Sequence, residues 1–477
     1  MKTDFASRLL TLAFAFAMAA TSRADVSAIV TSVQQNWPWD TRVKVSYEVS
    51  GGVCDVTPAL VFGGLDLAIK IPQSLLLAQV SNMTHAVKGD VYAVGPGPHE
   101  LEFDAAQVKF PENVARPTFQ KGLSVTLSAK ETSFRKYLVL DLTTTPYGVS
   151  WLDDVPAGGW TDEYKTSKMV LARIPVYGGT TFEVGAPTNE FGYVESYEKL
   201  AFSKLTNDFY MCVFEVTQKQ WENVMGSVPS TIAANNVGDT KPVTKVSWLD
   251  FMGVALDANG YNWPSTSAVS SDCFVGKLRA NTTLPACFFS GYKFNLPTQV
   301  QWEFACRGGV MNTWYTGADI SVTLDMTRTG TARQYDENVE SIAWYPHNTD
   351  RLKPVGGKLP NPYGIYDMIG NASEWCVDYA LVEPCPSGTE PVGKEPPKVA
   401  NAPLRALRGG NYASFLFAST TYGSYTNINI SAGGSAFYGL LTQRPAFKVR
   451  GSWTDKHDFI GGRVVLAYTR IAENVAQ

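Results

Sequence analysis

The sequence predicts an α+β protein with two structural regions. From Val26 to Leu142, short segments alternate apolar with polar residues, and turn residues separate them, which is typical of β-strands. Three later segments begin with residues that cap α-helices. We therefore expect a strand-rich N-terminal region, followed by a loop-rich region that mixes short helices with strands.

Composition and charge narrow the classes of partner. The chain has 477 residues, of which 44 are acidic, 40 are basic and 45% are hydrophobic. These values are typical of a folded protein with two or three domains. Acidic and basic residues nearly balance, and the sequence has no long run of Lys or Arg. It therefore gives no sign of a basic surface that could bind a phosphate backbone, and we expect no nucleic-acid partner.

Residues 1–24 have the pattern of a secretory signal peptide. Lys2 and Arg8 precede the apolar run from Leu9 to Ala20, and Ser22 and Ala24 place small residues before a cleavage site. No later run reaches the ~18 apolar residues that a spanning helix needs. We expect a bacterial protein that is secreted, periplasmic or displayed at the cell surface.

Residues 25–145 predict a β-sandwich of the immunoglobulin or fibronectin type. The segments RVKVSYEVSGG, HELEFDA and GLSVTLSA alternate, and KYLVLDL closes the region. Residues 146–164 are rich in Pro, Gly and Asp and predict a linker. The second domain is then expected to cover residues 165–477.

Helix starts in the second domain are indicated by capping boxes, in which a Ser or Thr side chain and a residue three positions later satisfy each other's backbone N–H groups. A Gly at the other end predicts each stop. The predicted helices follow Thr217, Ser247 and Thr298 and end at Gly226, Gly260 and Gly308.

The seven cysteines leave at least one thiol outside any disulfide. Cys273 and Cys287, in a polar stretch, are the best candidates for a disulfide. The cysteines of apolar segments are expected to be small buried residues: Cys212, Cys306 and Cys376. A disulfide between Cys376 and Cys385 remains an alternative.

Six blocks of the second region resemble, in order, those of the formylglycine-generating enzyme family, also called sulfatase-modifying factor domains. They are YMCVFEVTQKQWENVMG, KPVTKVSWLDFMGVAL, FNLPTQVQWEFACRGG, NPYGIYDMIGNASEWCVD, LRGGNY and GGRVVLAY. The resemblance covers about residues 165–470 and implies a C-type-lectin-like fold. This fold serves copper-dependent oxidases, sulfoxide-forming enzymes and non-enzymatic display proteins, so it does not decide function.

The resemblance implies where copper would bind in a catalytic member. Two cysteines hold it, the first lying three residues after a Gly-Gly-Ser start and the second five residues further on. After Gly409, Gly410 and Asn411, these positions hold Ser414 and Ser419. Soft thiolates suit Cu(I) and hydroxyls do not, so we expect neither copper nor the family's oxidase chemistry.

The resemblance also implies a calcium site. Its ligands would be the side chains of Asp367 and Glu374 and the carbonyls of Gly370 and Ala372. Calcium prefers such oxygen ligands. The alternative is that both carboxylates accept backbone N–H groups in a buried turn.

The segment from Asn411 to Tyr438 has no charged residue and mixes aromatic with small polar residues, a composition that favours recognition. Its candidate binding residues are Asn411, Tyr412, Phe415, Tyr422, Tyr425 and Asn427. The alternative is an uncharged loop packed over the domain. Elsewhere, Arg408 and Arg463 are expected to fix carboxylates inside the fold.

Together these features predict a non-catalytic module that binds an extracellular peptide, glycan or protein. One alternative is a formylglycine-generating-type oxidoreductase that acts on protein cysteines through atypical residues. The other is a structural module of a surface assembly, or a diversified ligand-display protein.

Overall fold

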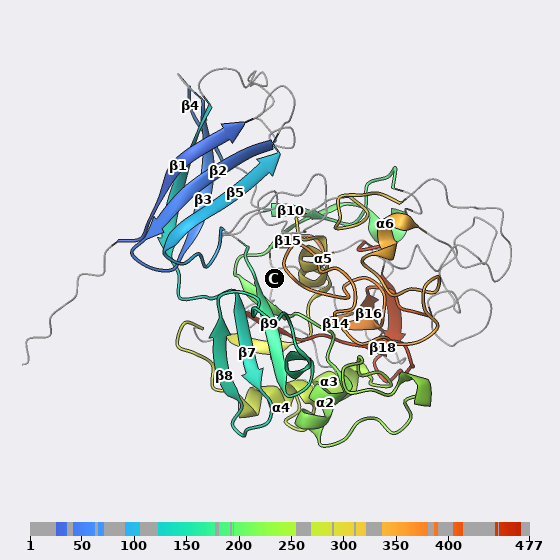
Figure 1. The fold of residues 1–477 in the computed structure, drawn as a ribbon. Coiled ribbons are helices and arrows are strands. Elements are labelled where there is room, and N and C mark those ends of the chain that lie inside the picture. Colours follow the sequence, from blue (N-terminus) through green and yellow to red (C-terminus); the bar gives the residue numbers. More distant parts are fainter. Residues whose placement is uncertain are drawn as a thin grey trace, which may run out of the picture.

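The structure is a computed structural model, and its described part is mostly β-strand with few helices (Figure 1). It describes residues 25–35, 42–62, 65–70, 91–104, 123–176, 181–190, 193, 195–253, 269–288, 291–309, 312–320, 336–379, 386–389, 404–413, 444–446 and 448–468. Within these residues, no helix is long and apolar enough to cross a membrane.

Two three-stranded antiparallel sheets form the N-terminal region. The first has the order β1-β2-β5, and the second has the order β4-β3-β6. Their strands are β1 (Ser27–Gln35), β2 (Arg42–Ser50), β3 (Cys54–Phe62), β4 (Leu65–Lys70), β5 (Gly97–Asp104) and β6 (Leu123–Glu131). In β2 the residues from Val43 to Val49 alternate between buried and more exposed positions, as its sequence predicts.

The last strand assigned by sequence to the N-terminal sandwich belongs to a different sheet. Strands β7 (Tyr137–Asp141) and β8 (Gly148–Leu152) join a six-stranded sheet of order β13-β19-β12-β9-β7-β8. Its other strands are β9 (Lys168–Ile174), β12 (Phe209–Cys212), β13 (Tyr292–Asn295) and β19 (Val465–Tyr468). The predicted linker 146–164 therefore does not separate the two regions, because β7 on one side of it pairs with β9 on the other.

Two smaller sheets complete the second region. One has the order β17-β16-β14-β18 and contains β14 (Ser373–Tyr379), β16 (Leu404–Arg408), β17 (Val449–Ser452) and β18 (Ile460–Gly461). The other has the order β10-β11-β15 and contains β10 (Thr181–Val184), β11 (Ala201–Lys204) and β15 (Gly388–Thr389).

The three capping boxes begin helices as predicted. They open α2 (Gln218–Met225), α3 (Trp248–Met252) and α5 (Gln299–Arg307), and left-handed glycines follow α2 and α5 at Gly226 and Gly308. The expected stop of α3 at Gly260 is wrong. The helix ends at Gly253, where φ is 68° and where a Cβ atom would lie 2.3 Å from the Cβ of Ser270.

The remaining helices were not expected from the sequence. Helix α4 (Phe274–Asn281) begins at Cys273, whose sulfur accepts the N–H of Gly276 in place of the usual oxygen. Within the described residues, the others are the single turns α1 (Glu195–Glu198) and α6 (Glu337–Glu340) and the 3₁₀ turns Asp162–Lys165 and Ala234–Asn236.

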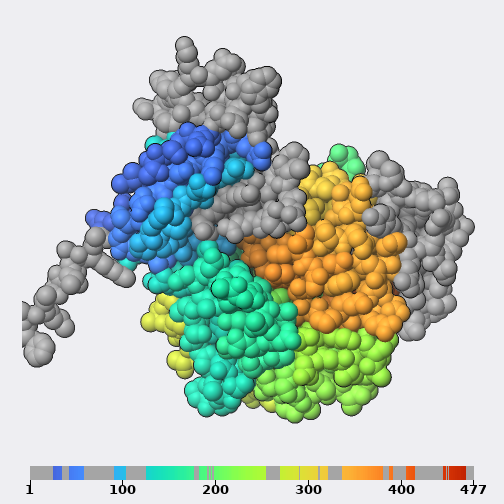
Figure 2. Space-filling view, viewed as in Figure 1, coloured from blue at the N-terminus to red at the C-terminus, as the bar shows by residue number. Residues whose placement is uncertain are grey.

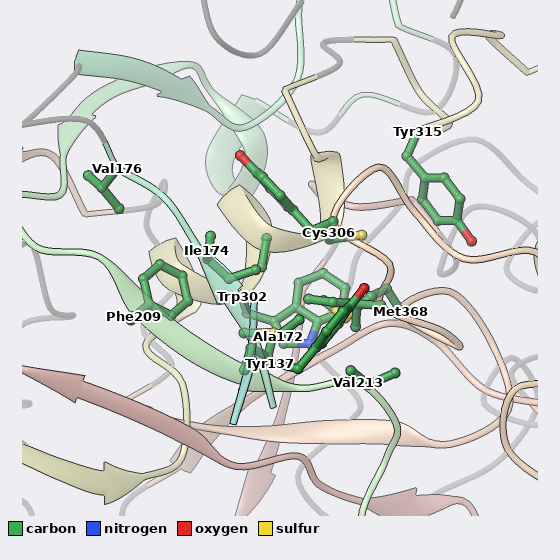
Figure 3. Packing of buried hydrophobic residues seen from close by; sticks show 14 of the residues in the cluster. Tyr137, Ala172, Ile174, Val176, Phe209, Val213, Trp302, Cys306, Tyr315 and Met368 are labelled. Atoms are coloured by element: carbon green, nitrogen blue, oxygen red, sulfur yellow. The ribbon is translucent and has the colours of Figure 1, made fainter. Parts of the chain in front are cut away.

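The central strands β9 and β12 of the six-stranded sheet are buried on both faces. Alternate residues of β9 enter two separate apolar clusters: Ala172 and Ile174 lie in one, and Leu171 lies in the other. Helix α5 supplies Trp302 and Cys306 to the first cluster (Figure 3), and α2, α3 and α4 line the second. Because period-two alternation places neighbouring side chains on opposite faces, this sheet is a central layer between helices.

Candidate functional site

The turn that precedes the family's copper positions is held against the core. Strand β16 ends at Arg408 and is followed by Gly409 and Gly410, with φ of 91° and 67°. A Cβ atom on Gly409 would lie 3.2 Å from both the Met368 carbonyl oxygen and Cζ2 of Trp302. A side chain there would be strained by both conformation and space.

Ser414 and Ser419 lie outside the described residues, as do four of the six candidate binding residues, Phe415, Tyr422, Tyr425 and Asn427. The two described candidates have partners inside the domain. Asn411 Nδ2 donates to Ser373 Oγ at 2.8 Å, and Asn236 Nδ2 donates to the Tyr412 hydroxyl at 3.0 Å. Asn411 is 2% exposed and Tyr412 is 8% exposed, so both anchor the start of the uncharged segment.

The predicted calcium turn is buried, and its backbone is left-handed at several positions. Asp367, Gly370 and Asn371 have φ of 56°, 81° and 59°. The Gly370 N–H donates to the Gly409 carbonyl at 2.7 Å, which joins this turn to the Gly409–Gly410 turn. The two turns therefore form one packed unit.

The two carboxylates of the turn have different surroundings. Gly356 N–H donates to Asp367 Oδ2 at 2.6 Å, whereas Oδ1 is buried and has no hydrogen-bond partner. The Glu374 carboxylate accepts from Arg463, with Nη2 to Oε1 at 2.7 Å, and from Trp302 Nε1 at 2.7 Å. Asp367 thus has an oxygen available for a cation, while Glu374 already has strong donors.

A third buried carboxylate, from Glu215, was missed by the sequence analysis. It accepts from Asn371 Nδ2 at 2.6 Å and from Ala372 N–H at 2.8 Å, so it is hydrogen-bonded to the same turn. The sequence feature that could have indicated it is the lone acidic residue in the apolar stretch YMCVFEV. A charged residue at such a position is buried only when it is paired or hydrogen-bonded.

Glu215, Asp367 and Glu374 face one buried cation, Arg463. Burial, and then the nearby Asp367 and Glu374, raise the pKa of Glu215 well above its ordinary value. Burial likewise raises the pKa of Asp367, to about 6. The site therefore disfavours three negative charges at once. In the described part of the chain, no group of three or more His, Cys, Asp or Glu side chains could itself hold a metal ion.

Burial disfavours the thiolate form of five described cysteines. Burial raises the pKa of Cys54 to about 11 and of Cys212 to about 12, and it also raises the pKa of Cys273, Cys287 and Cys306. A raised pKa disfavours the thiolate that binds metal or attacks a substrate. The predicted disulfide between Cys273 and Cys287 is wrong, because both carry free thiols.

The buried arginines have the structural role predicted for Arg408 and Arg463. Arg408 Nη2 donates to Glu303 Oε2 at 2.8 Å, which ties β16 to α5. Arg444, just beyond the undescribed segment 414–443, binds Glu198 of α1 at 2.7 Å. Both ends of that segment are thus fixed by buried polar contacts.

Comparison with known proteins gives this architecture a family. The model of the FGE-sulfatase family, described as a sulfatase-modifying factor enzyme 1-like domain, matches residues 162–468. The formylglycine-generating enzyme of Bos taurus is 26% identical over 232 residues, which is 43% of this chain and 56% of that enzyme. The chaperone protein LppX of Paenibacillus barcinonensis is 28% identical over 213 residues, which is 39% of this chain and 68% of LppX.

Two solved structures are also similar. PvdO from Pseudomonas aeruginosa has a TM-score of 0.40 and 15% identity, with 62% of this chain and 94% of PvdO covered. Treponema denticola variable protein 1 has a TM-score of 0.39 and 20% identity, with 63% of this chain and 95% of that protein covered. Because the family model covers well over half of the chain, this protein belongs to the FGE-sulfatase family of sulfatase-modifying factor enzyme 1-like domains.

Proposed function

We propose that this chain is a non-catalytic member of its family, a binding module for an extracellular peptide, glycan or protein. The observation that carries the proposal is the pair Ser414 and Ser419 at the positions where a catalytic member holds copper with cysteines. No cysteine follows Cys385, so a small shift in alignment does not restore the pair. Serine hydroxyls are hard, weak ligands for Cu(I).

The chemistry of the described cysteines supports this proposal. Burial raises the pKa of Cys212 and of Cys306. Both side chains are buried in the hydrophobic core and are almost inaccessible to solvent. A protonated, enclosed thiol neither binds Cu(I) nor exchanges with a substrate thiol. The buried hydrogen bonds of Asn411 and Tyr412 support a fixed start of the uncharged segment.

The finer assignment of fold is part of the same proposal. The second domain would have a C-type-lectin-like fold, and the N-terminal sheets would form an immunoglobulin- or fibronectin-like sandwich. Residues 1–24 would direct export, so that the module acts after secretion, in the periplasm or at the cell surface.

We also propose a structural calcium ion beside Asp367. The residues fit in part: Asp367 Oδ1 is a buried oxygen without a partner, and a cation would balance a cluster of three carboxylates and one arginine. Asp367 and the carbonyls of Gly370 and Ala372 would hold the ion, with Glu374 shared between it and Arg463. Calcium would contribute charge balance and fix the turn.

Copper(I) binding tests the proposed function directly. The mature protein is titrated with Cu(I) against a chromophoric chelator, beside the double variant Ser414→Cys/Ser419→Cys. We expect no stoichiometric binding by the natural sequence and a gain of one site in the variant. Tight binding of one Cu(I) by the natural sequence would overturn the proposal and favour an oxidase with atypical residues.

A further inference from the structure

The buried residue Arg173 joins the N-terminal sheets to the second domain. Arg173 lies in β9 of the six-stranded sheet and is 3% exposed. Its guanidinium donates to both oxygens of Asp55 in β3, from Nη1 to Oδ1 at 2.8 Å and from Nη2 to Oδ2 at 2.7 Å. This two-pronged arrangement is the strongest and most directional form of the contact.

Asp208, from the second domain, binds the same guanidinium. Arg173 Nε donates to Asp208 Oδ2 at 2.9 Å, and the Val176 N–H donates to Asp208 Oδ1 at 2.8 Å. Burial alone would lower the pKa of Arg173, but Asp208 and Asp55 together hold it above its ordinary value. The arginine therefore stays charged, with a carboxylate from each region.

Asp55 is held in position within its own region. The N–H of Ala93 donates to Asp55 Oδ1 at 2.9 Å, and Ala93 has a φ of 50°, which is rare for a residue with a side chain. Backbone hydrogen bonds between Cys54 and Val94 pin the 91–94 segment to the start of β3. Contacts within the N-terminal region thus help to orient the carboxylate that Arg173 binds.

Apolar contacts continue across the same junction. One buried cluster contains Val56 and Val94 from the N-terminal region together with Ile174 and Val176 from the second domain. In the space-filling view the blue and cyan residues of the N-terminal sheets meet the teal residues below them (Figure 2). A domain joined only by a flexible linker would have its own separate core.

We propose that Asp55, Arg173 and Asp208 form a latch that makes the N-terminal sheets and the second domain one cooperative unit of fixed mutual orientation. Opening the junction would strip Arg173 of one carboxylate and expose the shared cluster. A partner bound to either region would then be held at a fixed angle to the other.

Hydrogen exchange on the natural mature protein is the first test. If the latch holds, the core amides of β2 and β12 exchange through the same opening, with protection factors within about tenfold of each other. Protection in β2 that is more than about a hundredfold lower than in β12 would overturn the latch, because the N-terminal sheets would then open alone.

The variant Asp55→Asn is the second test, with Glu100→Gln as its control, since Glu100 forms an exposed pair with Lys44 in the same sheets. We expect calorimetry to resolve two transitions for Asp55→Asn and one for Glu100→Gln. Exchange should accelerate in β2 but not in β12. A single transition for Asp55→Asn at the natural melting temperature would refute the latch. If that variant does not fold, the exchange experiment decides.

Discussion

Arg463 and Glu374 form a fully buried ion pair, with Nη2 donating to Oε1 at 2.7 Å and Nε donating to Oε2 at 3.0 Å. The same arginine donates from Nη1 to the carbonyl of Cys212 at 2.8 Å and from Nη2 to that of Tyr366 at 2.9 Å. One guanidinium thus joins β14 to the end of β12 and to the loop before Asp367. Arg463 therefore holds three segments of the second domain together through buried polar contacts.

Replacing Arg463 should be strongly destabilising. Arg463→Ala leaves Glu374 buried without its cation, and loss of one partner of a buried pair costs about 3–5 kcal/mol. The free energy of unfolding in denaturant measures the loss. The control is Arg351→Ala, which removes an exposed pair with Asp350 and should cost below about 1 kcal/mol. Equal effects in the two variants would contradict the assigned role.

Trp302 offers a second test of the core. It is completely buried in the cluster of Figure 3, and its Nε1 donates to Glu374 at 2.7 Å. Trp302→Ala should destabilise the protein by about 3–5 kcal/mol through the cavity it creates. Trp302→Phe, which keeps an aromatic ring but loses the donor, should cost about 1–3 kcal/mol. A change below about 1 kcal/mol for the alanine variant would mean that the indole is not a core residue.

Calcium should stabilise the folded state of the natural protein. It should not stabilise a variant that lacks the side-chain oxygens of Asp367. An ion that binds only the folded state raises the melting temperature with its concentration. We expect chelation to lower the melting temperature of the natural protein and to leave that of Asp367→Ala unchanged. The same melting temperature for the natural protein in chelator and in excess calcium would contradict the proposed calcium site.

The loop that precedes Arg463 should make stability depend on pH. The His457 ring stacks on Phe459, with centroids 5.2 Å apart. Burial lowers the pKa of His457; Asp455 and Asp458 oppose this shift, and Lys245 adds to it. The unfolded chain therefore binds a proton more readily than the folded one. The neutral, half-buried His457 ring therefore contributes to the free energy of unfolding above about pH 6.5. This contribution is lost as pH falls toward the pKa of His457 in the folded state.

The variant His457→Gln checks this dependence. Stability measured between pH 8 and pH 5 should fall less steeply for the variant than for the natural sequence. If the two slopes are the same in that interval, His457 does not titrate with unfolding.

Local features of the fold could be predicted from the sequence where a few adjacent residues determine them. The capping residues of α2 and α5 fixed both helix starts, and Gly226 and Gly308 fixed their ends. Helix α4 was not predicted because its N-cap is Cys273, and cysteine is not one of the usual capping residues.

Pairings across the chain could not be predicted in the same way. The segment KYLVLDL was expected to be a strand, but only the tertiary structure shows that β7 pairs with β9 rather than with the N-terminal sheets. The contact of Glu215 with Ala372 joins residues 157 positions apart. Sequence spacing holds no information on such a contact. The pairing of Arg408 and Arg463 with carboxylates was confirmed because a buried guanidinium requires one.

The most direct measurement of the central claim is mass spectrometry of a cysteine-containing sulfatase-type peptide. The peptide is incubated with the purified mature protein, copper, a reductant and oxygen, beside an active formylglycine-generating enzyme as control. We predict that its cysteine stays unmodified while the control converts it. Conversion of the cysteine to formylglycine by this protein would contradict the claim that a chain with Ser414 and Ser419 in place of the copper-binding cysteines has no oxidase activity.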